Sequence, residues 1–288
     1  MPMKGGEIKN IMAKFLKTKI ILFFLIIIFA LAAASATPVY AAPTFVRVAA
    51  KLSPNDPSSV VNGITYNPMQ GQGKIDITGV QAGNFLVVIT SLSAAQPTTV
   101  TSSTGETWIN DIHSTVSQNP GDSLDIFHAS DVTGGSKTIY ITSPQTRALR
   151  AVVLEYSGVA PNSPAHRTSK QSEIHPSGGA PITGSAGSVT TTIPNSLIVV
   201  GCRTDSDFMG WSPGPGYTMR TNPNTGSEPD QKVGVEDMVA AAAGTYSGTF
   251  TFNSDLFACG MVAYAPSEGG GGATLPAAPA APSGLTVQ

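Results

Sequence analysis

The stretch LDIFHASDVTGGSKTIYITSPQTRALRAVVLEYSG, residues 124–158, decides the fold. Residues 138–142 alternate isoleucine with threonine or tyrosine, which is the period-two pattern of a strand with one face in water. Gly134 and Gly135 mark a turn before this strand. Residues 151–156 form an apolar run without a helical period. The stretch therefore predicts three β-strands joined by turns.

The same pattern returns about 111 residues later in the chain. Four short segments of the first copy match four of the second in the same order: 84–88 with 195–199, 105–108 with 216–219, 138–141 with 249–252, and 154–157 with 262–265. A repeat of this length is a domain or half-domain, since solenoid units have only about 20 to 50 residues.

Composition also favours a β protein outside the cell. The chain has 288 residues, is 41% hydrophobic and only 12% charged, and contains 30 glycines. This length allows one or two well-cored domains. Short strands separated by turn residues indicate a sandwich or barrel; we predict them at 44–51, 74–78, 84–91, 105–110, 123–129, 137–143 and 148–157, then at 188–193, 196–203, 216–221, 232–240, 246–252 and 257–265.

We predict an all-β fold, a jelly-roll-like β-sandwich built from two similar halves, 44–160 and 161–267, that share one core. The strands that close the halves, 151–156 and 257–264, are apolar at both parities. Such strands are covered on both faces. The alternative is two tandem immunoglobulin-like sandwiches of about 110 residues each.

Residues 1–36 have the features of a secretion signal peptide. Three lysines at 14, 17 and 19 precede an apolar run at 20–31, and Ala34-Ser35-Ala36 provides a cleavage site. We therefore expect a secreted protein, extracellular or at the cell surface, that meets a membrane only through this peptide. Residues 1–36 carry five lysines and one glutamate, so their removal changes the formal net charge from −2 to −6. An acidic chain disfavours nucleic acid as a partner.

The composition changes again after the sandwich region. Residues 268–282 are rich in Gly, Pro and Ala, as in a linker. The last residues, 283–288 within APSGLTVQ, resemble the first strand of a fibronectin type III domain. That resemblance implies that the chain continues into such a domain.

Four segments of the sandwich region occur in a recognisable succession: GETW, LDIFHASDVTGGSKTIYIT, VVLEYSGV and SVTTTIPNSLIVVG. The succession is similar to uncharacterised secreted bacterial modules that often sit beside fibronectin type III or carbohydrate-binding domains. The resemblance covers about residues 45–266 and departs at Glu106, where those modules usually have Asn. It implies a β-sandwich with a role at the cell surface, and it brings no catalytic residues.

A GDSL sequence at 121–124 and a D-x-x-H block at 125–128 spell two signatures of a serine esterase family. In that family the two blocks lie far apart in the sequence, whereas here they are contiguous. On an extended strand, Ser123 and His128 would be roughly 16 Å apart. A nucleophile and its base need about 3 Å. We therefore predict no catalytic residues and no enzyme activity here.

Metal sites have little support in the sequence. The four histidines lack metal-ligand spacing; they are His113, His128, His166 and His175. Asp205 and Asp207 form a D-x-D at the end of a predicted strand and could ligate Ca²⁺. Loop aspartates that start turns are the alternative. No other cofactor is expected.

Trp211 and Tyr217, in and after a Pro/Gly-rich loop, are candidate binding residues, because exposed aromatic rings bind sugars and protein partners. The alternative is that Trp211 folds over the end of the sandwich. Cys202 and Cys259 could form a disulfide if their Cα atoms come within about 7 Å. Two buried free thiols are the alternative.

These features lead us to expect a non-catalytic extracellular module for adhesion or glycan binding, with glycans or extracellular proteins as partners. A structural spacer that presents downstream domains is the second hypothesis. A hydrolase is the third, and it lacks a catalytic cluster.

Overall fold

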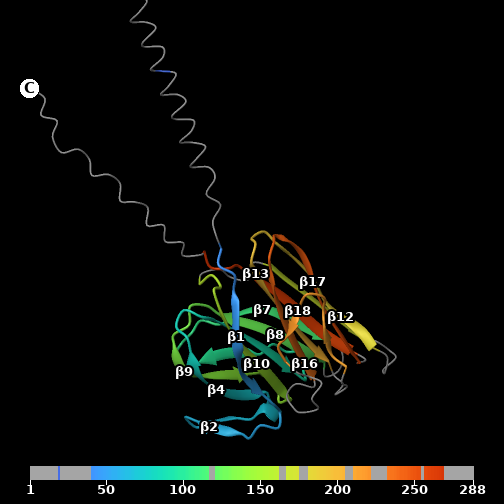
Figure 1. Cartoon of the computed structure of the whole chain (residues 1–288). Helices are drawn as coiled ribbons and strands as arrows, with labels where there is room; N and C mark the ends of the chain where they lie inside the picture. The colour runs from blue at the N-terminus through green and yellow to red at the C-terminus, as the bar shows by residue number, and fades with distance from the viewer. Residues whose placement is uncertain are drawn as a thin grey trace, which may run out of the picture. The chain divides into compact units, whose positions relative to one another are not determined.

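The computed structural model describes Lys19 and residues 40–116, 121–161, 167–174, 181–204, 210–221, 232–253 and 256–268. The expected signal peptide apart from Lys19, the linker apart from Glu268 and the fibronectin-like end lie outside the described residues. Within the described parts, no helix is long and apolar enough to cross a membrane. The described residues from Tyr40 onward belong to one compact unit (Figure 1).

The first half contains eight principal strands and a small hairpin. The principal strands are β1 (Thr44–Leu52), β4 (Gln72–Val80), β5 (Phe85–Leu92), β6 (Thr99–Ser102), β7 (Ile109–Val116), β8 (Asp122–Ala129), β9 (Gly135–Thr142) and β10 (Leu149–Ser157). The hairpin pairs β2 (Ser59–Val61) with β3 (Ile64–Tyr66), and the 3-10 turn η1 (Pro68–Gln70) follows it.

These strands form two antiparallel sheets with jelly-roll connectivity. One sheet has the order β1-β10-β5-β8-β7 and the other β4-β9-β6. Counting the principal strands in chain order, the first lies beside the eighth, the third beside the sixth, and the second beside the seventh. This interleaving of early and late strands is that of a jelly roll, which joins two Greek keys.

The second half repeats this topology strand for strand. It contains β11 (Arg167–Ile174), β12 (Pro181–Thr191), β13 (Ser196–Thr204), β14 (Ser212–Pro213), β15 (Thr218–Met219), β16 (Val233–Ala240), β17 (Gly244–Asn253) and β18 (Leu256–Tyr264). Its sheets have the orders β11-β18-β13-β16-β15 and β12-β17-β14. The segments matched in the sequence lie on, or directly beside, equivalent strands of the two halves.

Side-chain alternation on the central strands produces three cores. On β10, Val152 and Leu154 face a core that includes residues of both five-stranded sheets, while Ala151 and Val153 face the core of the first half. On β18, Val262 likewise belongs to the shared core, and its neighbours belong to the core of the second half. In the shared core, β7 and β8 of the first half pack against β18 of the second (Figure 1).

The predicted all-β sandwich is confirmed, and the jelly roll occurs twice. Among the described residues, every sheet takes its strands from one half only. Each half therefore has its own pair of sheets, with jelly-roll rather than immunoglobulin strand order, and the two halves meet in the shared core. Their closing strands are apolar on both faces, so each buries one face in its own half and the other in the shared core.

Two tyrosine hydroxyls hydrogen-bond across the shared core in a pseudo-symmetric way. Tyr156, at the end of β10, donates to Asp237 Oδ2 of the second half at 2.7 Å. Its counterpart Tyr264, at the end of β18, donates to Asp111 Oδ2 of the first half at 2.7 Å. Burial raises the pKa of both hydroxyls well above the usual value, so both stay protonated and act as donors.

Candidate functional site

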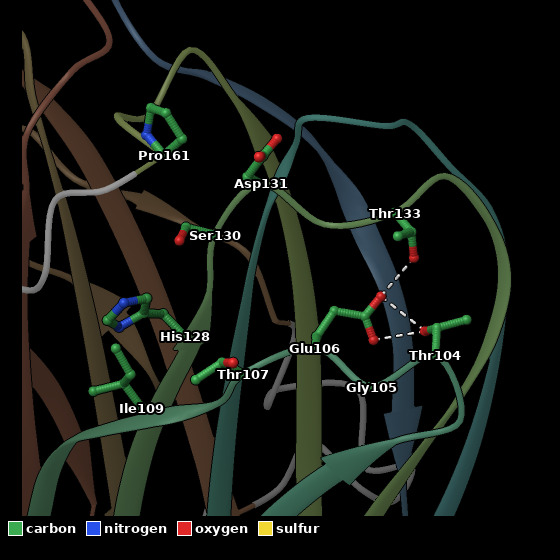
Figure 2. A pocket seen from close by; sticks show the side chains of 10 residues that line it. All are labelled: Thr104, Gly105, Glu106, Thr107, Ile109, His128, Ser130, Asp131, Thr133 and Pro161. Carbon is green, nitrogen blue, oxygen red and sulfur yellow. Dashed lines mark hydrogen bonds between the residues drawn. The ribbon is translucent and has the colours of Figure 1, made fainter.

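A pocket of about 500 Å³ opens in the first half, at the end of β8 (Figure 2). The loop before β7, the turn after β8 and Pro161, after β10, surround it. Most of its lining side chains carry hydroxyl, carboxyl or imidazole groups: Thr104, Glu106, Thr107, His128, Ser130, Asp131 and Thr133. The loop turns at Gly105, whose φ of 77° is a left-handed conformation that glycine adopts without strain.

Glu106 is held on one side of the pocket by four donors. Its carboxylate accepts hydrogen bonds from Lys137 Nζ at 2.7 Å, from Thr133 Oγ1 at 2.8 Å, from Thr104 Oγ1 at 2.6 Å and from Ser102 Oγ. Burial raises its pKa, but the hydrogen bonds from Lys137 and the three hydroxyls prevail and lower the pKa to about 2. The carboxylate is therefore ionised and rigid at neutral pH.

His128 lies on the opposite side of the pocket, at the end of β8 (Figure 2). Its Nδ1 lies 2.6 Å from Asp111 Oδ2, the same oxygen that accepts from Tyr264. The ring stacks on Phe85 with centroids 5.2 Å apart and meets the edge of Tyr264 at 5.3 Å. Its orientation is therefore fixed on three sides.

The bond to Asp111 also determines the chemistry of the His128 ring. A carboxylate only accepts, so Nδ1 must carry the hydrogen. No hydrogen bond joins Nε2 to any of the described residues. His128 lines the pocket, but the residue is only 1% exposed and its ring is packed against Phe85 and Tyr264.

The structure does not bring the esterase-like residues together. Ser123 and His128 lie near opposite ends of β8, and Ser123 Oγ donates to Gln96 O at 3.1 Å. Asp125, in the D-x-x-H block, faces His113 instead, with its Oδ1 2.7 Å from His113 Nδ1. That bond raises the pKa of His113. The pairing of His128 with Asp111 is one that the motif does not suggest.

The expected binding aromatics are buried, and the structure corrects that expectation. Trp211 is only 4% exposed, and its ring packs 4.7 Å from the ring of Phe252 in the core of the second half. Tyr217 is 8% exposed and belongs to the same core. Trp211 folds inward because Gly234 leaves room for it: a Cβ at residue 234 would lie 2.4 Å from the indole.

Cys202 and Cys259 form a disulfide in the structure. They lie directly opposite each other on β13 and β18, with Cα atoms 4.0 Å apart. Asp205 and Asp207, the possible calcium ligands, lie outside the described residues, as do His166 and His175. Elsewhere, in the parts that the structure describes, no group of three or more His, Cys, Asp or Glu side chains could hold a metal ion.

Sequence reasoning overlooked most of the pocket. It noted Glu106 only as a departure from a family pattern and treated His128 as an ordinary strand histidine. A signal was nevertheless present in the repeat. At the offset of 111, Glu106 corresponds to Tyr217 and His128 to Val239, so the two copies differ in chemistry at two of the positions that line the pocket.

Comparisons of the chain with protein-family models, with curated proteins and with solved structures found no match. The chemistry of the pocket is therefore the basis on which a function can be proposed.

Proposed function

We propose that this chain is a non-catalytic extracellular module that binds glycans in the pocket between Glu106 and His128. The observation that carries the proposal is the polar, pre-organised wall. Hydroxyl, carboxylate and imidazole groups converge on one cavity, and Glu106 is already fixed by four hydrogen bonds. A sugar residue presents several hydroxyls in a fixed geometry, which such a wall can match.

The size of the pocket and the fold are consistent with this ligand class. A volume of about 500 Å³ lies within the range of about 300–1,000 Å³ that is typical of small-molecule sites. Jelly rolls include lectin domains, an analogy at the level of fold that supports the proposal without identifying a ligand. Secretion, as the leader predicts, would expose the pocket to cell-surface glycans.

The proposal is tested with residues 40–268 on an array of neutral and acidic oligosaccharides, followed by titration calorimetry of the hits. Thr107→Val and Ser130→Ala each remove one hydroxyl from the wall, and each should weaken binding about tenfold or less, the value of one neutral hydrogen bond. Ser188→Ala is the matched control, because Ser188 pairs with Ser247 on an exposed face of the second half. Its affinity should equal that of the wild type.

The absence of binding to any glycan at millimolar concentration would contradict the proposal and favour the structural spacer. Equal affinity of the wild type and both wall variants would show that glycans bind elsewhere on the molecule.

A further inference from the structure

We infer that the pocket selects an uncharged sugar residue over an acidic one, and that Tyr264 of the second half is a positioning residue for this selection. The inference rests on the proposed glycan binding and specifies its ligand class. Two independent features of the structure support it. The first is the set of hydrogen-bond donors and acceptors in the pocket wall, and the second is the series of contacts from His128 through Asp111 to Tyr264.

The wall presents acceptors and no free cation. Thr104 and Thr133 donate their hydroxyl hydrogens to Glu106; the Thr133 oxygen already accepts from Lys137 Nζ at 3.2 Å, and the Thr104 oxygen is left to accept. Lys137 Nζ is buried and donates to Glu106 Oε1 at 2.7 Å, to Thr133 O at 2.6 Å and to Thr133 Oγ1 at 3.2 Å. Among the described residues that line the pocket, none is a lysine or an arginine.

Among these described lining residues, a ligand carboxylate or sulfate would find no lysine or arginine partner. Asp131, on the turn after β8, adds a carboxylate to the rim. Bringing a second anion beside it costs free energy, because like charges repel and the ligand must also lose water. The hydroxyls of a neutral sugar instead donate to the acceptors of the wall without this cost.

His128 lines the pocket opposite Glu106, and the orientation of its ring depends on the second half. Asp111 receives Nδ1–H of His128 and the hydroxyl of Tyr264 on the same oxygen. The Tyr264 ring also packs edge-on against the imidazole at 5.3 Å. Tyr264 thus fixes the carboxylate that fixes the imidazole, although Tyr264 itself does not line the pocket.

The pseudo-symmetry of the molecule provides a matched control for Tyr264. Tyr156 makes a similar bond in the opposite direction, from β10 to Asp237 on β16, where Arg220 also binds. Neither Tyr156 nor Asp237 lines the pocket. Tyr156→Phe and Tyr264→Phe therefore each delete one buried hydroxyl between the halves, and only the second deletion reaches His128.

The first readout is independent of any ligand. Nitrogen-15 NMR of the imidazoles in residues 40–268 should show His128 as the Nδ1–H tautomer in the wild type and in Tyr156→Phe, and as a mixture of tautomers in Tyr264→Phe. Thermal melts establish that both variants are folded. An unchanged tautomer in Tyr264→Phe, or the same change in both variants, would overturn the positioning role.

The second readout is the array, with oligosaccharides that differ only by a terminal sialic or uronic acid. The wild type should bind the neutral forms at least about tenfold more tightly, a difference typical of one or two polar contacts. Tyr264→Phe should weaken binding of the neutral forms about threefold to tenfold, and Tyr156→Phe should leave it unchanged. Preference for the acidic forms would overturn this inference and leave glycan binding intact, whereas binding of no glycan would overturn both.

Discussion

The two halves share one strand order but differ at the ends of their strands. Where the first half places Glu106 in the wall of a pocket, the second places Tyr217 in its hydrophobic core. Where the first half has His128, the second has Val239. The two halves share their strand order, and at these two pocket positions they differ in chemistry.

The middle of one strand shows a second contrast. Asp125 on β8 and Glu236 on β16 occupy the same position of the repeat, and both are buried. Asp125 is surrounded by donors, with His113 on one oxygen and Thr98 on the other. Glu236 accepts from Gly214 N on one oxygen, while its Oε1 has no partner within the described structure. Burial raises the pKa of Glu236 to about 8, so the second half holds a neutral acid at pH 7.

The largest expected effect separates contacts between the halves from contacts within one half. Arg203 of β13 forms a buried ion pair with Asp122 of β8, across the shared core. Asp122→Ala should lower the free energy of unfolding by about 3–5 kcal/mol, because it removes a carboxylate that pairs with a buried cation. The control is Asp76→Ala, which removes a 62% exposed partner of Lys74 and should cost less than about 1 kcal/mol. Urea unfolding measures both, and equal losses would mean that the contact between the halves adds little.

The disulfide gives a somewhat smaller test, because it constrains only the second half. Cys202 and Cys259 are 57 residues apart in the chain. Replacing both with alanine should lower the free energy of unfolding by about 2–4 kcal/mol, mainly because the unfolded chain gains conformational entropy when it is no longer cross-linked. The affinity of the first-half pocket for its ligand should not change. A variant as stable as the wild type would show that the bridge is not a significant constraint.

The smallest expected effect uses pH to compare the two buried acids. The folded-state pKa of Glu236, about 8, lies above its usual value of 4.5. Folding therefore favours the protonated acid, and its contribution to stability is complete below pH 4.5 and is lost as the pH rises through about 8. The side chain that Glu236→Gln introduces stays neutral at every pH. The free energy of unfolding of this variant relative to that of the wild type should therefore rise by about 1–3 kcal/mol between pH 5 and pH 9.

The stability contribution of His113 also varies with pH, so the wild type and Glu236→Gln must be compared at the same pH. Its pKa is raised by the bond to Asp125, so it too contributes stability that is present at low pH and lost as the pH rises above 6.5. That contribution is equal in the wild type and in Glu236→Gln, and it cancels in their difference. A difference that does not vary with pH would mean that Glu236 is not protonated in the folded protein.

Local sequence patterns predicted the architecture because it depends on alternation. The isoleucines and threonines of 138–142 indicate one buried face, and the apolar residues at both parities of 151–156 indicate two. These patterns, together with the repeat, imply two similar halves and a core between them. They do not indicate which way Trp211 turns, because that depends on space left by Gly234 on another strand.

The candidate site was harder to predict because its contacts are non-local. Glu106 meets Lys137 from 31 residues away, and Asp111 meets Tyr264 from 153 residues away. No motif spans such separations. The contiguous GDSL and D-x-x-H blocks show the converse, since residues close in sequence lie near opposite ends of one strand.

We expect each of the two jelly rolls to depend on the shared core for its stability. Residues of both five-stranded sheets lie in that core, so a first half alone, 44–160, should be unfolded or aggregated even though it has a core of its own. Differential scanning calorimetry of residues 40–268 tests the claim most directly. We predict one transition whose calorimetric and van't Hoff enthalpies agree. Two separate transitions would contradict the claim and would mean that the halves are independent domains.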